Sequence, residues 1–111
     1  MEYYKRKAEA EKYHSSWHNS YKLLNTENGC VNGCFVGISE YLLDVYSNPQ
    51  IHEDQEGFVV MSGGGWALVG EQEFRLEPET AFIVPAGIQH SFKKDPDVPY
   101  VKVFWFHAAI K

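Results

Sequence analysis

Cysteine is scarce in this sequence, with only Cys30 and Cys34 among 111 residues. Three residues separate the pair, and no second cysteine or histidine pair follows at the spacing of a zinc finger. We therefore interpret both as ordinary thiols at the start of a strand. A disulfide between them is not needed in a reducing compartment.

Positive charge is also in short supply, because 10 Lys and Arg residues face 15 Asp and Glu residues, for a net charge of −5. A chain without a basic stripe is not expected to bind nucleic acid directly. No apolar run approaches the ~18–20 residues of a membrane span, and no charged-then-apolar leader opens the sequence. We expect a cytoplasmic protein that binds neither nucleic acid nor a membrane.

Apolar residues, by contrast, make up 44% of the sequence and aromatic residues 15%, which is enough for the packed core of one domain. Turn signals separate a series of short β-type runs. These runs cover residues 34–38, 41–46, 57–61, 66–69, 74–76, 81–84 and 98–107. The pattern predicts an all-β barrel or jelly roll over residues 25–111. A glycine triplet at 63–65 predicts a sharp hairpin turn.

Residues 1–24 show no clear strand pattern and are interpreted as an N-terminal arm. Residues 3–12 could form a short helix. Tyr13, Trp17 and Tyr21 recur every four residues, which suits a helix face and an irregular arm equally well. Exposed aromatic rings need a partner surface. We expect the arm to pack on its own barrel or to be exchanged with that of a second subunit.

Two separated segments offer side chains that bind metals. Gln50, His52 and Glu56 share the same parity, so in a strand their side chains leave the same face. His90 closes a turn that contains proline and glycine, which fix the direction of one imidazole. Together the two segments predict one divalent-metal pocket inside a small β-barrel.

The same residues resemble the two signature motifs of the cupins, which are small double-stranded β-helix proteins. The first motif reads H-x-H, three or four residues, E, six residues, G, and here it is matched by Gln50, His52, Glu56 and Gly63. The second motif, P-x-G-x-x-H, is intact and ends at His90. The resemblance covers about residues 30–107 and implies the cupin jelly-roll barrel.

The resemblance also implies a metal site. Its ligands would be His52, Glu56 and His90, with Gln50 as a fourth ligand through its amide oxygen in place of the usual histidine. Without Gln50, the remaining ligands are two histidines and one carboxylate. This is the facial triad that binds non-haem Fe(II), and Mn, Co, Ni and Zn can bind it as well. In a metal-free barrel the same groups would hydrogen-bond to each other and to water. Other departures from the motifs affect turns or rims, at Asp44, Glu79 and Lys94.

His107 is a further candidate for catalysis. By alternation it shares one face with Val103 and Trp105, whereas Phe104 and Phe106 point the other way. If its face is the inner one, His107 lies near the pocket and could act as a general acid or base. Otherwise it is a histidine at the barrel mouth without a chemical role. The two outward phenylalanines predict a homodimer packed sheet to sheet.

Two classes of function remain open. The first is a small metal-dependent enzyme, of isomerase or dioxygenase type, that acts on a sugar-like or carboxylate-bearing molecule, with Glu56 as a base if it leaves the metal. The second is a sugar-binding or sensor module without chemistry, because residues 57–107 also resemble the sensor domain of AraC-type regulators. The matching residues there are Gly63, Gly65 and Trp66, the turn to His90, and the run 95–100. Those regulators also need a helical DNA-binding domain, which this sequence does not contain.

Overall fold

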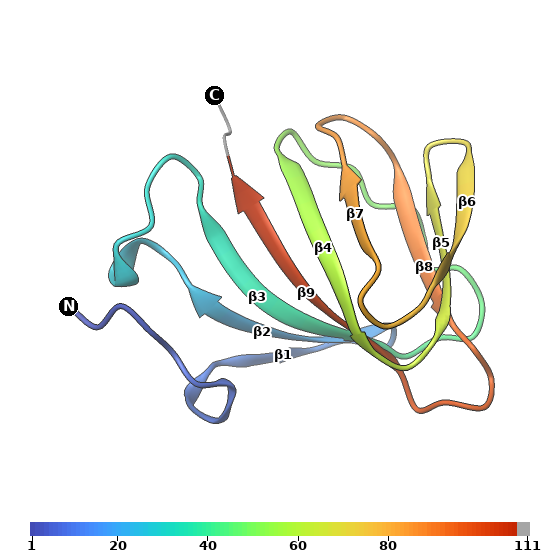
Figure 1. The fold of residues 1–111 in the computed structure, drawn as a ribbon, viewed down its shortest axis with the longest axis horizontal. Coiled ribbons are helices and arrows are strands. Elements are labelled where there is room, and N and C mark those ends of the chain that lie inside the picture. The colour runs from blue at the N-terminus through green and yellow to red at the C-terminus, as the bar shows by residue number, and fades with distance from the viewer. Residues whose placement is uncertain (109–111) are drawn as a thin grey trace.

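The computed structural model of the protein describes residues 1–108, which form two antiparallel β-sheets and two 3-10 turns (Figure 1). The larger sheet has the strand order β1-β2-β3-β9-β4-β7 and the smaller one the order β6-β5-β8. The elements are η1 Lys7–Glu9, β1 Lys12–His14, β2 His18–Leu24, η2 Thr26–Asn28, β3 Phe35–Tyr41, β4 Gln55–Ser62, β5 Gly65–Val69, β6 Gln72–Leu76, β7 Ala81–Val84, β8 His90–Lys94 and β9 Val101–Ala108. This is the all-β jelly-roll architecture predicted from the sequence.

The core lies between the two sheets and follows the alternation of side chains along the strands. In β9, Val101, Val103 and Trp105 are buried, whereas Phe106 on the opposite face is exposed. Phe58 of β4 is 1% exposed and stacks on Phe82, with ring centroids 4.6 Å apart. The smaller sheet closes the core with further buried side chains, which are Ala67, Leu76 and Phe92.

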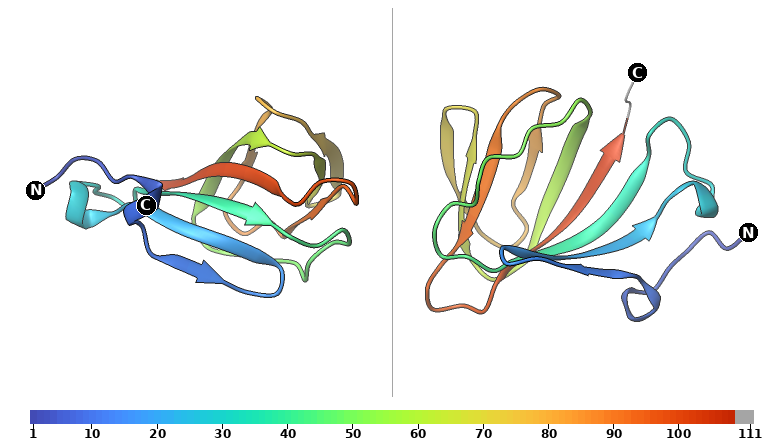
Figure 2. Two further views of the ribbon diagram at one scale, coloured as in Figure 1. Left: turned by 90° about the horizontal axis from the view of Figure 1, so that it is seen from below. Right: turned by 180° about the vertical axis from the view of Figure 1, so that it is seen from behind.

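The larger sheet curves so that its β7 edge approaches the smaller sheet, while β1 and β2 lie at its opposite end (Figures 1 and 2). Strand β9 lies in the middle of this sheet, between β3 and β4. It therefore pairs with two strands that both lie far from it in the sequence. One end of the curved sheet remains open, and the candidate site lies there.

The expected strand at 41–46 is wrong except for Tyr41, which ends β3. The chain leaves the larger sheet here and runs along the free edge of β8. The amide of Lys94 donates to the carbonyl of Leu43, and the backbones of Gln50 and His90 exchange two hydrogen bonds of 2.8 and 2.9 Å. Since these contacts are spaced irregularly, the segment forms no continuous ladder, despite its β-forming composition.

The expected glycine hairpin is also wrong, because β4 and β5 belong to different sheets. The triplet carries the chain around a corner between them. A Cβ atom at Gly63 would lie 2.1 Å from the carbonyl oxygen of Tyr100, and one at Gly65 would lie 2.0 Å from that of Lys93. Gly63 also has a φ of +82°. Only glycine permits this close backbone approach.

The N-terminal residues form strands where the sequence left a helix or an irregular arm open. β2 pairs with β3 and β1 pairs with β2, so residues 12–24 extend the larger sheet. Trp17 lies in the turn between β1 and β2, where the hydroxyl oxygen of Ser15 accepts hydrogen bonds from two backbone amides. The ring of Trp17 stacks on His18 and on Tyr41. The spacing of four between aromatics therefore spans a strand, a turn and a second strand.

Among residues 1–108, no helix has both the length and the apolar character that a membrane span requires.

Candidate metal centre

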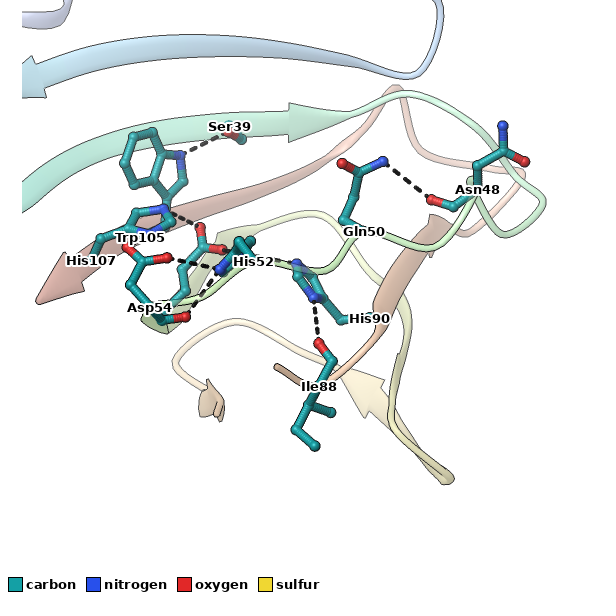
Figure 3. Close-up of polar contacts among 10 residues, drawn as sticks. Ser39, Asn48, Gln50, His52, Asp54, Ile88, His90, Trp105 and His107 are labelled. Atoms are coloured by element: carbon teal, nitrogen blue, oxygen red, sulfur yellow. Dashed lines mark hydrogen bonds and ion pairs between the residues drawn. The ribbon is translucent and has the colours of Figure 1, made fainter. Parts of the chain in front are cut away.

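The loop before β4, strand β4 and strand β8 bring the predicted ligands together (Figure 3). His52 lies in the loop before β4, Glu56 lies in β4, and His90 is the first residue of β8. The turn that ends at His90 has Gly87 at a φ of +77°, and the amide of Gly87 donates to the carbonyl oxygen of His52. The second motif is thus hydrogen-bonded directly to the first.

The three side chains converge within reach of one cation. His52 Nε2 lies 3.0 Å from Glu56 Oε1, and His90 Nε2 lies 3.9 Å from the same oxygen. One nitrogen or oxygen from each of the three residues lies within 4.8 Å of the other two. Glu56 and His90 are buried, and His52 is half-buried. Two imidazole nitrogens and one carboxylate form a donor set suited to a first-row divalent metal.

Hydrogen bonds on the far side of each ring leave the ligand nitrogens directed into the site. His52 Nδ1 lies 3.0 Å from the carbonyl oxygen of Asp54, and His90 Nδ1 lies 3.3 Å from that of Ile88. A carbonyl oxygen only accepts hydrogen bonds, so these two contacts favour the tautomer in which Nδ1 carries the proton. Each Nε2 is then free to offer its lone pair to a metal, as in known metal sites with a second layer of hydrogen bonds.

Asp54 and His107 join this cluster from the other side. The Nδ1 atom of His107 lies 2.6 Å from Asp54 Oδ2, and its Nε2 atom lies 3.2 Å from Glu56 Oε2. His52 Nδ1 lies 2.9 Å from the second oxygen of Asp54. His107 faces inward because it is paired in register with Glu56 across β9 and β4.

Burial and charge shift the pKa values in this cluster in opposite directions. Burial lowers the pKa of His90 below its ordinary value, which favours the neutral imidazole that a metal requires. Burial also opposes protonation of His107, but its hydrogen bonds to Glu56 and Asp54, together with their negative charges, raise its pKa overall. Burial would raise the pKa of Asp54, but the hydrogen bond and positive charge of His107 lower it.

Gln50 is placed differently from the other expected ligands. Its backbone pairs with His90, and its side chain is among those that line the site. Its amide nitrogen donates to the carbonyl oxygen of Asn48 at 3.4 Å, and the residue is exposed. Coordination through the amide oxygen therefore stays a prediction.

A cavity of about 190 Å³ opens beside the ligands. Its walls include the aromatic rings of Trp17, Tyr41 and Trp105 and the hydroxyl groups of Ser20 and Ser39. The indole nitrogen of Trp105 donates to the hydroxyl oxygen of Ser39 at 2.8 Å. The cavity can thus hold a small molecule between apolar faces and a few polar groups.

Several of these residues were not found by sequence reasoning. Asp54 has the same parity as His52 and Glu56, so the alternation argument that selected those two residues also applies to it. The wall residues Trp17, Ser20 and Ser39 lie on β2, β3 and the turn before β2. These carry no motif, and only the pairing of β2 with β3 brings them to the site.

Solved structures with this fold include several enzymes. The polyketide cyclase RemF from Streptomyces resistomycificus has a TM-score of 0.78 at 15% identity, over 94% of this chain and 77% of that one. KdgF from Halomonas sp. has a TM-score of 0.75 at 13% identity, over 94% and 93% of the two chains.

Hydroxypropylphosphonic acid epoxidase from S. wedmorenis, in complex with fosfomycin, has a TM-score of 0.75 at 14% identity. The match covers 92% of this chain but 57% of the epoxidase, so this chain spans just over half the length of that enzyme. At these identities the likeness shows a shared fold. No curated protein matches the sequence significantly.

The sequence itself matches a family directly. The cupin domain family matches residues 43–107, which is more than half of the chain and includes all four expected ligands. The jelly-roll fold and the convergence of both motifs on one site agree with that match. The protein therefore belongs to the cupin family.

Proposed function

We propose that the protein is a metal-dependent enzyme that binds a divalent transition metal through His52, Glu56 and His90. The observation that carries this proposal is the convergence of two Nε2 atoms and a buried carboxylate, with both Nδ1 atoms already engaged elsewhere. Mn, Fe, Co, Ni and Zn all suit such a donor set. Gln50 is the candidate for a fourth ligand through its amide oxygen.

When bound, such a metal supplies Lewis-acid polarisation of a substrate oxygen, or reaction with O2 in the case of iron. The chain supplies the surroundings for either reaction. Trp17 and Tyr41 provide flat apolar walls, and the hydroxyl group of Ser20 adds a polar contact. Glu56 and His107 are the groups we assign to proton transfer, because they line the cavity beside the ligands.

The size and lining of the cavity favour a small, oxygen-rich substrate, such as a sugar-like or carboxylate-bearing molecule. Both an isomerase reaction and a dioxygenase reaction are compatible with this cavity and the proposed metal. The structural neighbours named as a cyclase and an epoxidase support an enzyme over a storage protein. The structural neighbours also include a crystal structure named as Fe(II)-HppE with an alternative substrate. Oxygen uptake with candidate substrates under Fe(II) would distinguish a dioxygenase from an isomerase.

The direct test of the proposal is metal content. We expect the purified protein to carry a first-row divalent ion, measured by elemental analysis. If it does not, added metal should stabilise the protein, by about 2.7 kcal/mol at 100 times the Kd, because the ion binds only the folded state. A melting curve read with Mn, Fe, Co, Ni and Zn in turn measures this. Absence of both bound metal and any shift in melting temperature would rule the site out.

The second candidate function is a sugar-binding module without chemistry. The aromatic rings of Trp17 and Tyr41 favour it, because they are nearly parallel, with an interplanar angle of 8°, and both line the cavity. A sugar ring can pack on such a surface without a metal. Sugar affinity that survives treatment with a chelator would favour this function over the enzyme.

We also propose that the protein forms a homodimer through the outer face of β4, β7 and β9. Val59, Ile83 and Phe106 lie there around a shallow apolar groove and are between 37% and 48% exposed. A second copy of the same face would cover it with twofold symmetry.

Ile83→Lys should convert this dimer to a monomer in light scattering, because a charge would be buried in the contact. The matched control Val31→Lys changes a residue that is 68% exposed in the loop before β3, outside the apolar groove, and should leave the dimer intact. A monomeric wild-type protein at micromolar concentration would contradict the proposal.

A further inference from the structure

The carboxylate of Asp54 contacts two histidines at once. One oxygen lies 2.9 Å from His52 Nδ1 and the other lies 2.6 Å from His107 Nδ1. Asp54 is only 17% exposed at its side chain, so water competes little for these contacts. The first cupin motif spans this position but leaves its residue type unspecified. Each oxygen of the Asp54 carboxylate therefore contacts a histidine of the site.

The opposite nitrogens of the same two rings both face Glu56. His52 Nε2 lies 3.0 Å from Oε1, and His107 Nε2 lies 3.2 Å from Oε2. Two carboxylates and two imidazoles thus alternate in a closed ring. In this ring the two oxygens of Glu56 have different neighbours. Oε1 lies toward His52 and His90, whereas Oε2 is held by His107.

The backbone alone does not set the direction of His52. This histidine precedes β4 and lies in the loop that leaves the larger sheet after Tyr41. Its ring is held on the Nδ1 side by the carboxylate and the carbonyl oxygen of the same residue, Asp54. His90 differs, because it begins a strand and its Nδ1 contacts the backbone carbonyl of Ile88.

We propose that Asp54 is a positioning residue of the metal centre. It acts through His52, whose Nε2 it directs to the metal, and through His107, which holds one oxygen of Glu56 and leaves the other for coordination. This inference rests on the proposed metal-dependent function. In metal sites generally, a carboxylate that bonds to the second nitrogen of a ligand histidine fixes the orientation of the ring and typically contributes about 10–100-fold to metal affinity.

Three variants test the proposal in the full chain. Asp54→Ala removes both contacts, and Asp54→Asn keeps one acceptor oxygen, so it can serve only one of the two rings as an acceptor. Glu53→Gln is the matched control, because it removes the same charge from the adjacent, exposed residue. Affinity for Co²⁺ and Zn²⁺ is measured by competition with a chelator. Nitrogen chemical shifts of the histidine rings are measured in the metal-free protein.

We expect Asp54→Ala to weaken metal binding by about 10–100-fold, Asp54→Asn to lie between it and wild type, and Glu53→Gln to stay within about twofold. In the metal-free protein, the ring nitrogen shifts of His107, whose Nδ1 loses the Asp54 carboxylate, should change in Asp54→Ala, whereas those of His90 should not. Should Asp54→Ala fail to fold, Asp54→Asn carries both measurements.

A Co²⁺ or Zn²⁺ affinity of the Asp54 variants equal to that of wild type would overturn the inference. So would ring nitrogen shifts of His107 that do not respond to the loss of the Asp54 carboxylate. If the wild-type protein binds no metal, the proposed function fails instead. The nitrogen shifts then still decide whether Asp54 directs the two rings, so the two failures are distinguishable.

Discussion

Glu56→Gln, His52→Ala and His90→Ala are each expected to lower affinity for a divalent transition metal by at least about 100-fold, which exceeds the usual effect of an outer-layer residue. Each change removes one of the three donors that meet in the site. Glu56→Gln keeps the shape of the side chain but replaces a charged oxygen with a neutral one. Loss of affinity in this variant would therefore reflect coordination chemistry and not packing.

The measurement is the dissociation constant for Mn²⁺, Co²⁺ and Zn²⁺, together with the metal content after purification. His14→Ala is the matched control, because His14 is exposed and hydrogen-bonded only to Asn19 in the edge hairpin. It should bind metal as the wild type does. If all three site variants retained wild-type affinity, the ion would bind elsewhere and the proposed catalytic account would have no basis.

Phe58→Ala is expected to lower the free energy of unfolding by about 3–5 kcal/mol, which is a large fraction of the stability of a small domain. The side chain is 1% exposed and packs face to face on Phe82 and edge to face on Phe92. Its removal leaves a cavity between the two sheets that neighbouring strands cannot close, because hydrogen bonds hold β4 on both sides.

Chemical denaturation of the metal-free protein measures this loss without the added stability of a bound ion. Met61 of the same strand supplies the control, since it is 45% exposed and does not line the proposed dimer groove. Met61→Ala should cost less than about 1 kcal/mol. Equal losses in the two variants would mean that the sheets do not enclose a single core at this position.

The alternation of side chains predicted the central strands well. Residues 57–61 and 98–107 were read as strands, and β4 and β9 occupy most of those ranges. In both strands one face is packed on the core and the other faces outward, which produces a strong period of two. Alternation placed His107 on one face with Val103 and Trp105 but left open which face is the inner one, and the burial of those two residues in the structure decides it.

The edge of the larger sheet could not be predicted in this way. In β2, polar residues such as Asn19 and Ser20 lie on both faces, so hydrophobic alternation is absent. Its inner face lines a cavity instead of the core, which removes the apolar signal. Strand β8 was not predicted for another reason, because it starts at His90, where the sequence indicated only a turn.

The proposed metal ligands were accessible to sequence reasoning because their motifs carry backbone requirements as well as donor atoms. Gly87 at positive φ and the bond from its amide to His52 explain why glycine is found in the second motif. Asp54 lacks such a requirement. Its role depends on His107, which lies 53 residues away in the sequence and reaches it only after β9 has joined β4.

The position of β9 in the sheet has a consequence for how the chain folds during synthesis. Strand β3 leaves the ribosome long before its partner in the sheet, because residues 35–41 pair with residues 101–107. Until that late segment emerges, β3 and β4 lack the strand that joins them, and their apolar faces stay uncovered in the nascent chain. Assembly of the larger sheet must therefore follow synthesis of residues 101–108, and a site that includes His107 cannot form before those residues are made.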